Sequence, residues 1–340
     1  MRSDIGIDLG TDTTRIFMGK SIMLTQPTVI TIDNDTGEPK AFGKEAYEMI
    51  GRTSDRSTCV CPVQNGTIAD FEAAQMFLQQ CFSKVIGKKV VRPRTIVSIP
   101  GNITAVKQRS VVDALESAGA RNVCLIEAPL AAAIGLGVDF STPRGVTVVD
   151  IGKGTTEIAV LSMGGLARCE SLPIGSGAFD EEIIRFVRKE YNIAIGVLTA
   201  EKIKKAIGCV KPRSLEVGMT VSGLNLFNGL PQSVEVNTTQ LLDVMMSTAE
   251  EIIGAIVRVF EQTAPEMVAD TAKDGLILTG GGSLTYGLPE LLSSRLKMQV
   301  NRVDDPLNCV IKGIGKALNN SNVLKNGDYR FRSLEDLTIE

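Results

Sequence analysis

Two short segments far apart in the chain align with each other without a gap, and they constrain the fold more than any other feature. Residues 7–16 read IDLGTDTTRI and residues 149–158 read VDIGKGTTEI. Each pattern predicts a β-hairpin, in which an apolar strand ends at an Asp-x-Gly turn and a second strand returns. The turn presents a carboxylate, hydroxyls and backbone N–H groups, and its glycine lets a ligand approach the backbone closely. Asp-Gly turns are common in ordinary hairpins, but two copies in register indicate two related α/β domains that grip one phosphate chain.

A run of glycines supports this interpretation. Residues 276–279 (LILT) predict an apolar strand, Gly280, Gly281, Gly282 and Ser283 follow it, and a helix is expected to begin near Leu288. Glycines between a strand and a helix allow a flat ring or a phosphate to lie against the backbone. Elsewhere strands and helices alternate, and the apolar stripe over residues 242–260 predicts a long helix that packs in the core.

The composition excludes several classes of function. The chain has 340 residues, enough for two domains, and 44% hydrophobic against 22% charged residues is typical of a globular protein. The net charge of −3 does not indicate nucleic acid as a partner. The absence of histidine excludes Ser-His-Asp and Cys-His catalysis, and the seven scattered cysteines lack the CxxC spacing of zinc sites. No apolar run reaches the roughly 18 residues of a membrane-spanning helix, so we expect a cytoplasmic protein, at most peripheral to a membrane.

Four motifs occur in the order found in the superfamily of actin, sugar kinases and heat-shock ATPases. They are DLGT at 8–11, EAPLAAAIG at 127–135, DIGKGT at 150–155 and TGGG at 279–282. The stretches between them resemble the bacterial MreB family in particular, among them GTIADF at 66–71, YNIAIG at 191–196 and TAEKIK at 199–204. The resemblance covers about residues 4–320. It implies an α/β, actin-like (ribonuclease H-like) fold of two related domains, each with a small subdomain, and a nucleotide in the cleft between them.

The same resemblance implies the domain limits. Domain I would span residues 1–143, with a small subdomain at about 32–66, and would be completed by a returning helix at 306–320. Domain II would span residues 144–305, with a small subdomain at about 178–240. Residues 321–340 would form a polar tail outside the resemblance.

Carried over position by position, the resemblance implies a site for ATP and Mg²⁺. The first phosphate loop would comprise Asp8, Gly10, Thr11, Asp12 and Thr13, and the second Asp150, Gly152, Lys153, Gly154 and Thr155. Asp8 and Asp150 would hold Mg²⁺ mainly through water, because this ion gives up its hydration shell reluctantly. The base would lie on Gly280, Gly281, Gly282 and Ser283, and the nucleoside on Glu201, Lys202 and Lys204. From the residues alone, a solvated i,i+3 ion pair between Glu201 and Lys204 is the favoured alternative.

Two positions depart from the family pattern and bear on ATP hydrolysis. The family carries Glu-Glu-Pro where this chain has Glu127, Ala128 and Pro129, so the carboxylate that would position the attacking water is absent. Lys153 stands where the second loop normally has glycine, whereas Thr155, the other water-positioning residue, is retained. Glu127 is the candidate substitute, although one residue along a helix turns a side chain by about 100°. We expect ATP binding with slow or lost hydrolysis; the alternative is neutral drift with normal hydrolysis.

The segment at 87–94 (GKKVVRPR) lies where MreB proteins carry an apolar loop that enters the lipid interface. Val90 and Val91, flanked by basic residues, would suit the surface of an anionic bilayer. The alternative is a solvated hairpin whose valines begin the following strand.

The resemblance implies a polymerising scaffold that adds subunits head to tail and organises cell shape and cell-wall synthesis on the inner face of the cell membrane. Its partners would be copies of itself, a second MreB paralogue and membrane proteins of wall elongation, with no nucleic acid. Two alternatives from the same superfamily are a small-molecule kinase and a chaperone-type ATPase. The sequence shows no aspartate motif of a sugar pocket and no segment that resembles a chaperone's substrate-binding domain.

Overall fold

The computed structural model describes residues 4–87 and 92–319. In this part of the chain, two five-stranded sheets share one topology. The first has the order β10-β9-β1-β2-β3 and the second β18-β17-β11-β12-β13. Their strands are β1 (Ile5–Leu9), β2 (Thr13–Met18), β3 (Ser21–Pro27), β9 (Arg94–Ile99) and β10 (Arg121–Glu127), and β11 (Val146–Ile151), β12 (Thr156–Ser162), β13 (Gly165–Leu172), β17 (Leu276–Thr279) and β18 (Val300–Arg302).

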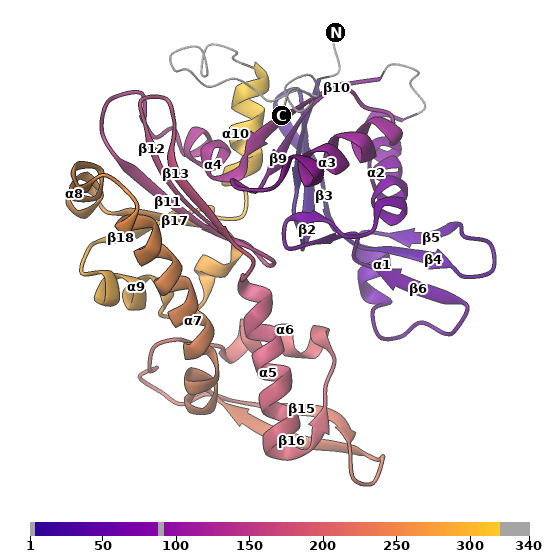
Figure 1. Cartoon of the computed structure of the whole chain (residues 1–340). Coiled ribbons are helices and arrows are strands. Elements are labelled where there is room, and N and C mark those ends of the chain that lie inside the picture. The colour runs from indigo at the N-terminus through magenta and orange to yellow at the C-terminus, as the bar shows by residue number, and fades with distance from the viewer. Residues whose placement is uncertain (1–3, 88–91, 320–340) are drawn as a thin grey trace.

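The two sheets also agree in strand direction, so the sequence repeat is a structural repeat. β1 pairs antiparallel with β2 and parallel with β9, and β11 pairs antiparallel with β12 and parallel with β17. Every residue of β12 is buried, as expected for a strand that is covered on both faces. The predicted hairpins therefore lie at equivalent places in two related halves, side by side in Figure 1.

Helices α4 (Ala128–Leu136) and α10 (Cys309–Asn319) pack against each other between the sheets, and their apolar side chains join strands of both halves in one core. The helix backbones approach very closely: a Cβ on Gly313 would lie 1.7 Å from the carbonyl oxygen of Ala131, and one on Gly135 would lie 2.0 Å from that of Cys309. The C-terminal helix thus returns to the first sheet, where it also contacts β1 and β2.

The first half has its own helices and a small sheet. α2 (Phe71–Ile86) and α3 (Ala105–Ser117) contribute buried side chains to the core of the first sheet, and the N-terminus of α2 is capped by Asp70, as its sequence indicates. The small sheet has the order β5-β4-β6, with α1 beside it. Its elements are β4 (Ile30–Asp33), β5 (Pro39–Phe42), α1 (Lys44–Glu48) and β6 (Ser57–Val60), followed by the short pair β7 (Val63–Gln64) and β8 (Thr67–Ile68).

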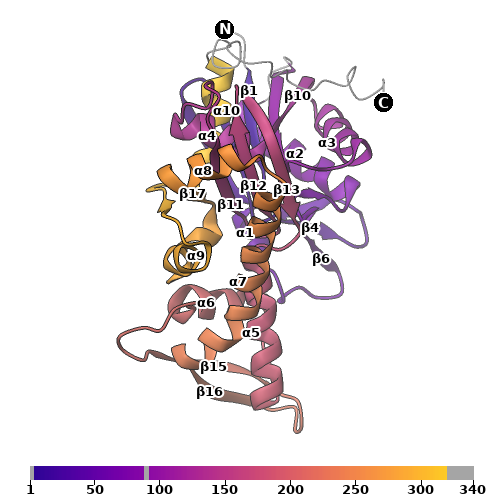
Figure 2. The ribbon, with the colours of Figure 1, turned by 60° about the vertical axis from the view of Figure 1, so that its left-hand side comes forward.

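The second half carries the equivalent additions. α5 (Ser176–Tyr191) and α7 (Thr238–Glu261) run from the second large sheet toward the small sheet β14-β15-β16 (Figure 2). Asn237 and Gln240 form a capping box at the start of α7, and the predicted apolar stripe packs in the core. The remaining elements are β14 (Ile193–Ala194), α6 (Val197–Ile207), β15 (Gly218–Asn225), β16 (Pro231–Asn237), α8 (Pro265–Asp274), the 3₁₀ turn η1 (Gly281–Leu284) and α9 (Leu288–Leu296).

Some of the expectations lie outside the described residues. These are the membrane loop at Val90 and Val91 and the tail at 321–340. The two small sheets fall within the predicted subdomains or close to their limits, while the domain boundaries themselves stay a prediction. Across the described helices, none combines the length and the apolar character needed to cross a bilayer.

Candidate functional site

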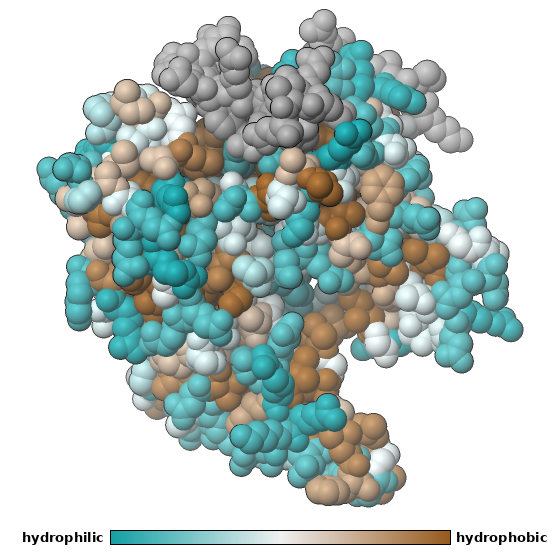
Figure 3. Space-filling model, in the orientation of Figure 1, coloured by the Kyte–Doolittle hydropathy of each residue, from teal (hydrophilic) through white to brown (hydrophobic). Residues whose placement is uncertain are grey.

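A cleft with a volume of about 760 Å³ lies between the two halves, and both predicted hairpin loops line it. The molecular surface is hollowed between the lobe that carries β4–β6 and the lobe that carries β15 and β16 (Figure 3). Most of the predicted site residues line this cleft: Asp8, Gly10, Thr11, Asp12, Thr13, Asp150, Gly152, Lys153, Gly154, Thr155, Glu201, Lys204, Gly280 and Gly281.

Four predicted residues are not among those that line the cleft. Gly282 and Ser283 are buried behind it, and the Ser283 hydroxyl donates a 2.6 Å hydrogen bond to the carbonyl of Gly280. These two residues therefore shape the glycine turn. Lys202 is exposed on α6. Glu127 ends β10 and is only 4% exposed.

The floor of the cleft is built by equivalent positions of the two hairpins. Asp8 lies opposite Arg15 in the first hairpin, and Asp150 lies opposite Glu157 in the second. Asp8 accepts hydrogen bonds from the Ser98 hydroxyl at 3.0 Å and from Arg15 Nη1 at 3.5 Å. The antiparallel register brings these side chains together, so equivalent positions carry a cation in one hairpin and a carboxylate in the other.

Burial is the main cause of the pKa shifts of the carboxyl groups on the cleft floor. It raises the pKa of Asp8, although the Arg15 charge opposes the rise. Burial, with the charges of Asp8 and Glu157, raises the pKa of Asp150 to about 7. Burial also raises the pKa of Glu157, which accepts hydrogen bonds from the Gly101 amide at 2.9 Å and the Ser171 hydroxyl at 2.7 Å. A carboxyl group with a pKa near neutrality can exchange a proton at ordinary pH.

The tips of the two loops almost touch. Thr11 Oγ1 accepts a hydrogen bond of 3.0 Å from the Gly66 amide. A Cβ on Gly154 would lie 2.6 Å from Thr11 Oγ1 and 3.0 Å from the Asn65 amide nitrogen. Only glycine fits at residue 154 without displacing the opposite loop, which agrees with the role predicted for glycines in this turn.

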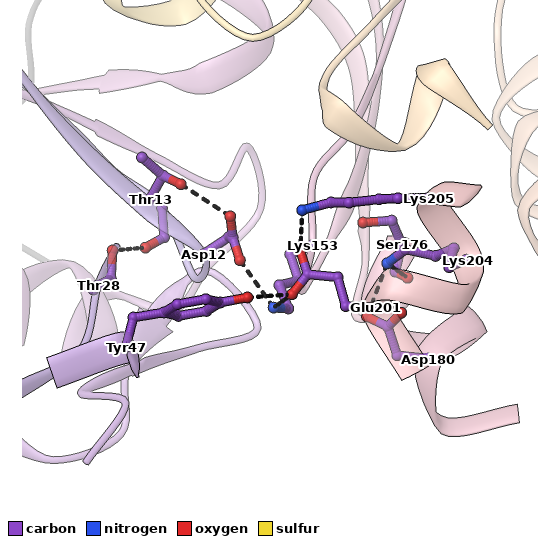
Figure 4. A network of polar contacts seen from close by, with 11 residues as sticks. Asp12, Thr13, Thr28, Tyr47, Lys153, Ser176, Asp180, Glu201, Lys204 and Lys205 are labelled. Atoms are coloured by element: carbon purple, nitrogen blue, oxygen red, sulfur yellow. Dashed lines mark hydrogen bonds and ion pairs between the residues drawn. The ribbon is translucent and has the colours of Figure 1, made fainter. Parts of the chain in front are cut away.

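A chain of polar contacts crosses the cleft between the small lobes (Figure 4). Lys153 Nζ lies 2.9 Å from Asp12 Oδ1 and 3.5 Å from Glu201 Oε2. Glu201 also accepts a 2.7 Å hydrogen bond from the Tyr47 hydroxyl and pairs with Lys205 at 2.6 Å. Asp12 and Tyr47 come from the first half, whereas Lys153 and Glu201 come from the second. The contacts therefore join both sides of the cleft.

The pKa values of these groups follow from the pairing. Burial alone would lower the pKa of Lys153. The charge of Asp12 and its hydrogen bond outweigh burial, so the pKa lies above its usual value. Burial alone would raise the pKa of Glu201, yet Lys205, Tyr47 and Lys153 together lower it to about 2. Both groups are therefore charged across the ordinary pH range.

The alternative of an i,i+3 ion pair between Glu201 and Lys204 is wrong. Glu201 pairs with Lys205 and Lys153, whereas Lys204 Nζ lies 2.8 Å from Asp180 Oδ2 and donates to the carbonyl of Ser176. Lys204 is thereby held against the N-terminal turn of α5 at the cleft wall.

Ala128 begins α4 and lines the cleft together with Thr155. Glu127, one residue earlier, lies toward the second sheet, because its charge acts on Cys169 of β13. Burial, and then the charges of Glu157 and Glu127, raise the pKa of the Cys169 thiol. Ala128 therefore lines the cleft and Glu127 does not. That Glu127 replaces the missing water-positioning carboxylate stays a prediction.

The glycine turn continues into a wall of apolar and aromatic side chains that the motifs did not indicate. Leu284, Tyr286 and Leu307 line the cleft and are about half exposed. The Arg213 guanidinium stacks over the Tyr286 ring at 4.3 Å. Such a wall can accept a flat ring. The only sequence signal for this wall is its proximity to Gly280 and Gly281. Arg15 and Glu157 on the cleft floor, in contrast, can be found from the register of the two hairpins.

Comparisons with known proteins agree with the geometry. A family model described as MreB/Mbl protein matches residues 2–326. The cell shape-determining protein MreB of Escherichia coli K12 is 40% identical over 323 residues, which cover 93% of each chain. The cell shape-determining protein Mbl of Bacillus subtilis 168 is 38% identical over 323 residues, 94% of this chain and 97% of that protein.

Solved structures give the same result. The crystal structure of MreB 5 of Spiroplasma citri bound to AMPPNP has a TM-score of 0.89 and 30% identity, and the match covers 96% of this chain and 98% of that one. A chain of the MamK double helical filament has a TM-score of 0.80 at 19% identity over 94% and 99% of the two chains, a likeness of fold alone. The predicted actin-like fold is confirmed. Because the family model spans nearly the whole sequence and relatives near 40% identity align over more than nine-tenths of it, the chain belongs to the MreB/Mbl family.

Proposed function

We propose that this chain is an ATP-binding bacterial actin that polymerises into filaments and organises cell shape. One observation carries the proposal: equivalent hairpins of two related halves converge on a single cleft, with hydroxyls, backbone amides and lysines where a phosphate chain would lie. The likeness to an MreB bound to AMPPNP and, in a second structure, to ADP supports a nucleotide as the ligand. The apolar wall at Leu284, Tyr286 and Leu307 would take its base.

Mg²⁺ would accompany the nucleotide. Asp8 and Asp150 line the cleft at the ends of equivalent strands, and carboxylate oxygens are ligands that this ion prefers, directly or through water. Asp8 already accepts from Ser98 and Arg15, which favours contact through water. Bound there, the ion would neutralise phosphate charge.

Filaments would form by head-to-tail contacts, because an open heterologous interface repeats without closing. The likeness of fold to MamK in its filament, together with the cell shape-determining relatives, supports self-association. We place the filament on the inner face of the cell membrane, attached through Val90 and Val91, with cell-wall elongation proteins and a second MreB paralogue as partners. Membership of the MreB/Mbl family favours this scaffold over a kinase or a chaperone-type ATPase.

Hydrolysis would be weak. Ala128 lines the cleft where a carboxylate would position water, and Thr155 alone remains of the two water-positioning residues. The chain would then form a scaffold that persists after ATP is added.

The proposal is tested by sedimentation and thermal unfolding with and without ATP. We expect ATP to promote pelleting and to raise the unfolding temperature, since only a ligand that binds the folded state stabilises it. Gly154→Val should reduce both effects, because a side chain at this position would displace the facing loop at Thr11. The same ATP-dependent stabilisation in parent and variant would remove the site assignment.

A further inference from the structure

Lys153 places a positive charge at the point where the two halves meet. Its Nζ lies 2.9 Å from Asp12 of the first loop and 3.5 Å from Glu201 of α6. The side chain is 22% exposed and lines the cleft beside both loops. The ammonium group of Lys153 is therefore built into the wall along which a phosphate chain would lie (Figure 4).

The two carboxylates that pair with Lys153 have other hydrogen-bond partners or are accessible to water, so Lys153 can leave them. Glu201 keeps Lys205 and the Tyr47 hydroxyl when Lys153 leaves. Asp12 is 43% exposed and accepts a 2.9 Å hydrogen bond from the Thr13 hydroxyl, so water can solvate it. Neither carboxylate would be left buried and unpaired. An ammonium that exchanges a carboxylate for a phosphate oxygen keeps a charge-assisted hydrogen bond throughout.

A second cation lies on the floor of the same cleft. Arg15 Nη1 lies 3.5 Å from Asp8 Oδ2, while Asp8 Oδ1 accepts from Ser98. Within the described residues, Arg15 Nε is buried without a hydrogen-bond partner. Both oxygens of one predicted metal-holding carboxylate are thus engaged, one of them by a fixed cation. Lys153 and Arg15 together carry as much positive charge as one Mg²⁺ ion.

We propose that Lys153, assisted by Arg15, supplies the countercharge for the phosphate chain of a nucleoside triphosphate, so that the affinity of this cleft for the nucleotide is independent of a divalent cation. The inference rests on the proposed nucleotide binding. Lys153 in this position and a divalent ion on the same phosphates repel each other, because both are positively charged. Either one can therefore supply the countercharge in place of the other. Mg²⁺ remains compatible with the site, but affinity does not depend on it.

The test is a calorimetric titration of the full chain with ATP, once with excess Mg²⁺ and once with EDTA. For the parent we expect removal of the metal to weaken binding by less than about threefold. For Lys153→Met, which keeps the aliphatic stem and removes the charge, we expect a loss of at least about tenfold in EDTA. Lys153→Arg should behave like the parent. Lys189→Met, the same charge change at an exposed position of α5, is the matched control and should also behave like the parent.

Each result decides one question. A parent that loses tenfold or more in EDTA overturns the inference, and this measurement needs no variant to fold. Undiminished binding by Lys153→Met in EDTA overturns the role of Lys153. A parent that binds no ATP under either condition overturns the proposed function itself.

Discussion

The hydroxyl of Tyr47 donates a 2.7 Å hydrogen bond to Glu201 across the cleft. Tyr47 belongs to the small helix α1 of the first half, and Glu201 lies on α6 of the second. The contact therefore forms only when the two small lobes are close together. With Lys153 and Asp12 it forms a polar network that joins the two lobes (Figure 4).

Tyr47→Phe should lower the thermal stability of the nucleotide-free protein, because it removes a hydrogen bond to a charged acceptor. We expect a coupling free energy of about 1 kcal/mol in a double-mutant cycle with Glu201→Gln. Limited proteolysis of the cleft loops should accelerate in the same variant. Additive effects of the two substitutions would show that the hydroxyl and the carboxylate do not interact in solution.

Asp150 should make stability depend on pH. Its pKa in the folded state is raised from 3.8 to about 7, so its contribution is fully present below about pH 4 and is lost as the pH rises through 7. Asp150→Asn removes this loss. Without nucleotide and divalent cations, we expect the variant to gain about 1–3 kcal/mol over the parent at pH 8 but little at pH 4.

Denaturant unfolding at several pH values between 4 and 8 measures this gain. Asp243→Asn, an exposed change of the same kind on α7, serves as the control and should run parallel to the parent. A constant difference between Asp150→Asn and the parent at every pH would contradict the assigned pKa.

The helix crossing between the halves gives a packing prediction. A Cβ on Gly313 would lie 1.7 Å from the carbonyl oxygen of Ala131, so Gly313→Ala must separate α10 from α4. We expect a loss of about 2–4 kcal/mol in the free energy of unfolding. Gly165→Ala is the control, since a Cβ there meets no atom within 4 Å. Equal stability of the two variants would show that the crossing adapts without cost.

Much of this architecture could be predicted from the sequence because it depends on local patterns. The repeated Asp-x-Gly turns identified two equivalent hairpins, and the run at Gly280 identified a third cleft element. All of the predicted phosphate-loop residues line the cleft, because a hairpin of this length leaves few ways to arrange its tip.

The remaining features depend on contacts between distant segments. Tyr47 meets Glu201 only because the two lobes lie close together, and no local sequence pattern encodes that distance. Arg15 lies directly opposite Asp8, a position that follows from the strand register and not from the turn motif. The glycine motif predicts Ser283 in the wall of the site, but its hydroxyl donates a hydrogen bond to Gly280 in the turn that supports the wall.

The segment with Val90 and Val91 gives a prediction for membrane attachment. Replacing both valines by serine should weaken binding to anionic liposomes, because apolar burial in the interface is lost while the flanking basic residues stay. Filament formation in solution should be unchanged. Co-sedimentation with vesicles of anionic and of neutral lipid measures this. Equal liposome binding by parent and variant would remove the segment as the anchor.

The last prediction concerns hydrolysis. Ala128 and Thr155 both line the cleft, but only Thr155 carries a group that can hold water. Loss of a general base costs on the order of 10²–10⁴ in rate, and it affects the chemical step without weakening binding.

Ala128→Glu combined with Lys153→Gly restores the family pattern and should raise phosphate release, measured with ATP and Mg²⁺, by at least about tenfold. Both changes are needed, because a new carboxylate at residue 128 could pair with the Lys153 ammonium instead of water. Ala128→Glu alone should therefore gain less, and Lys153→Gly alone should gain little because it adds no base. Glu127→Gln in the parent shows whether the neighbouring carboxylate supplies the residual rate. A parent that already releases phosphate as fast as the double variant would show that Ala128 does not limit hydrolysis.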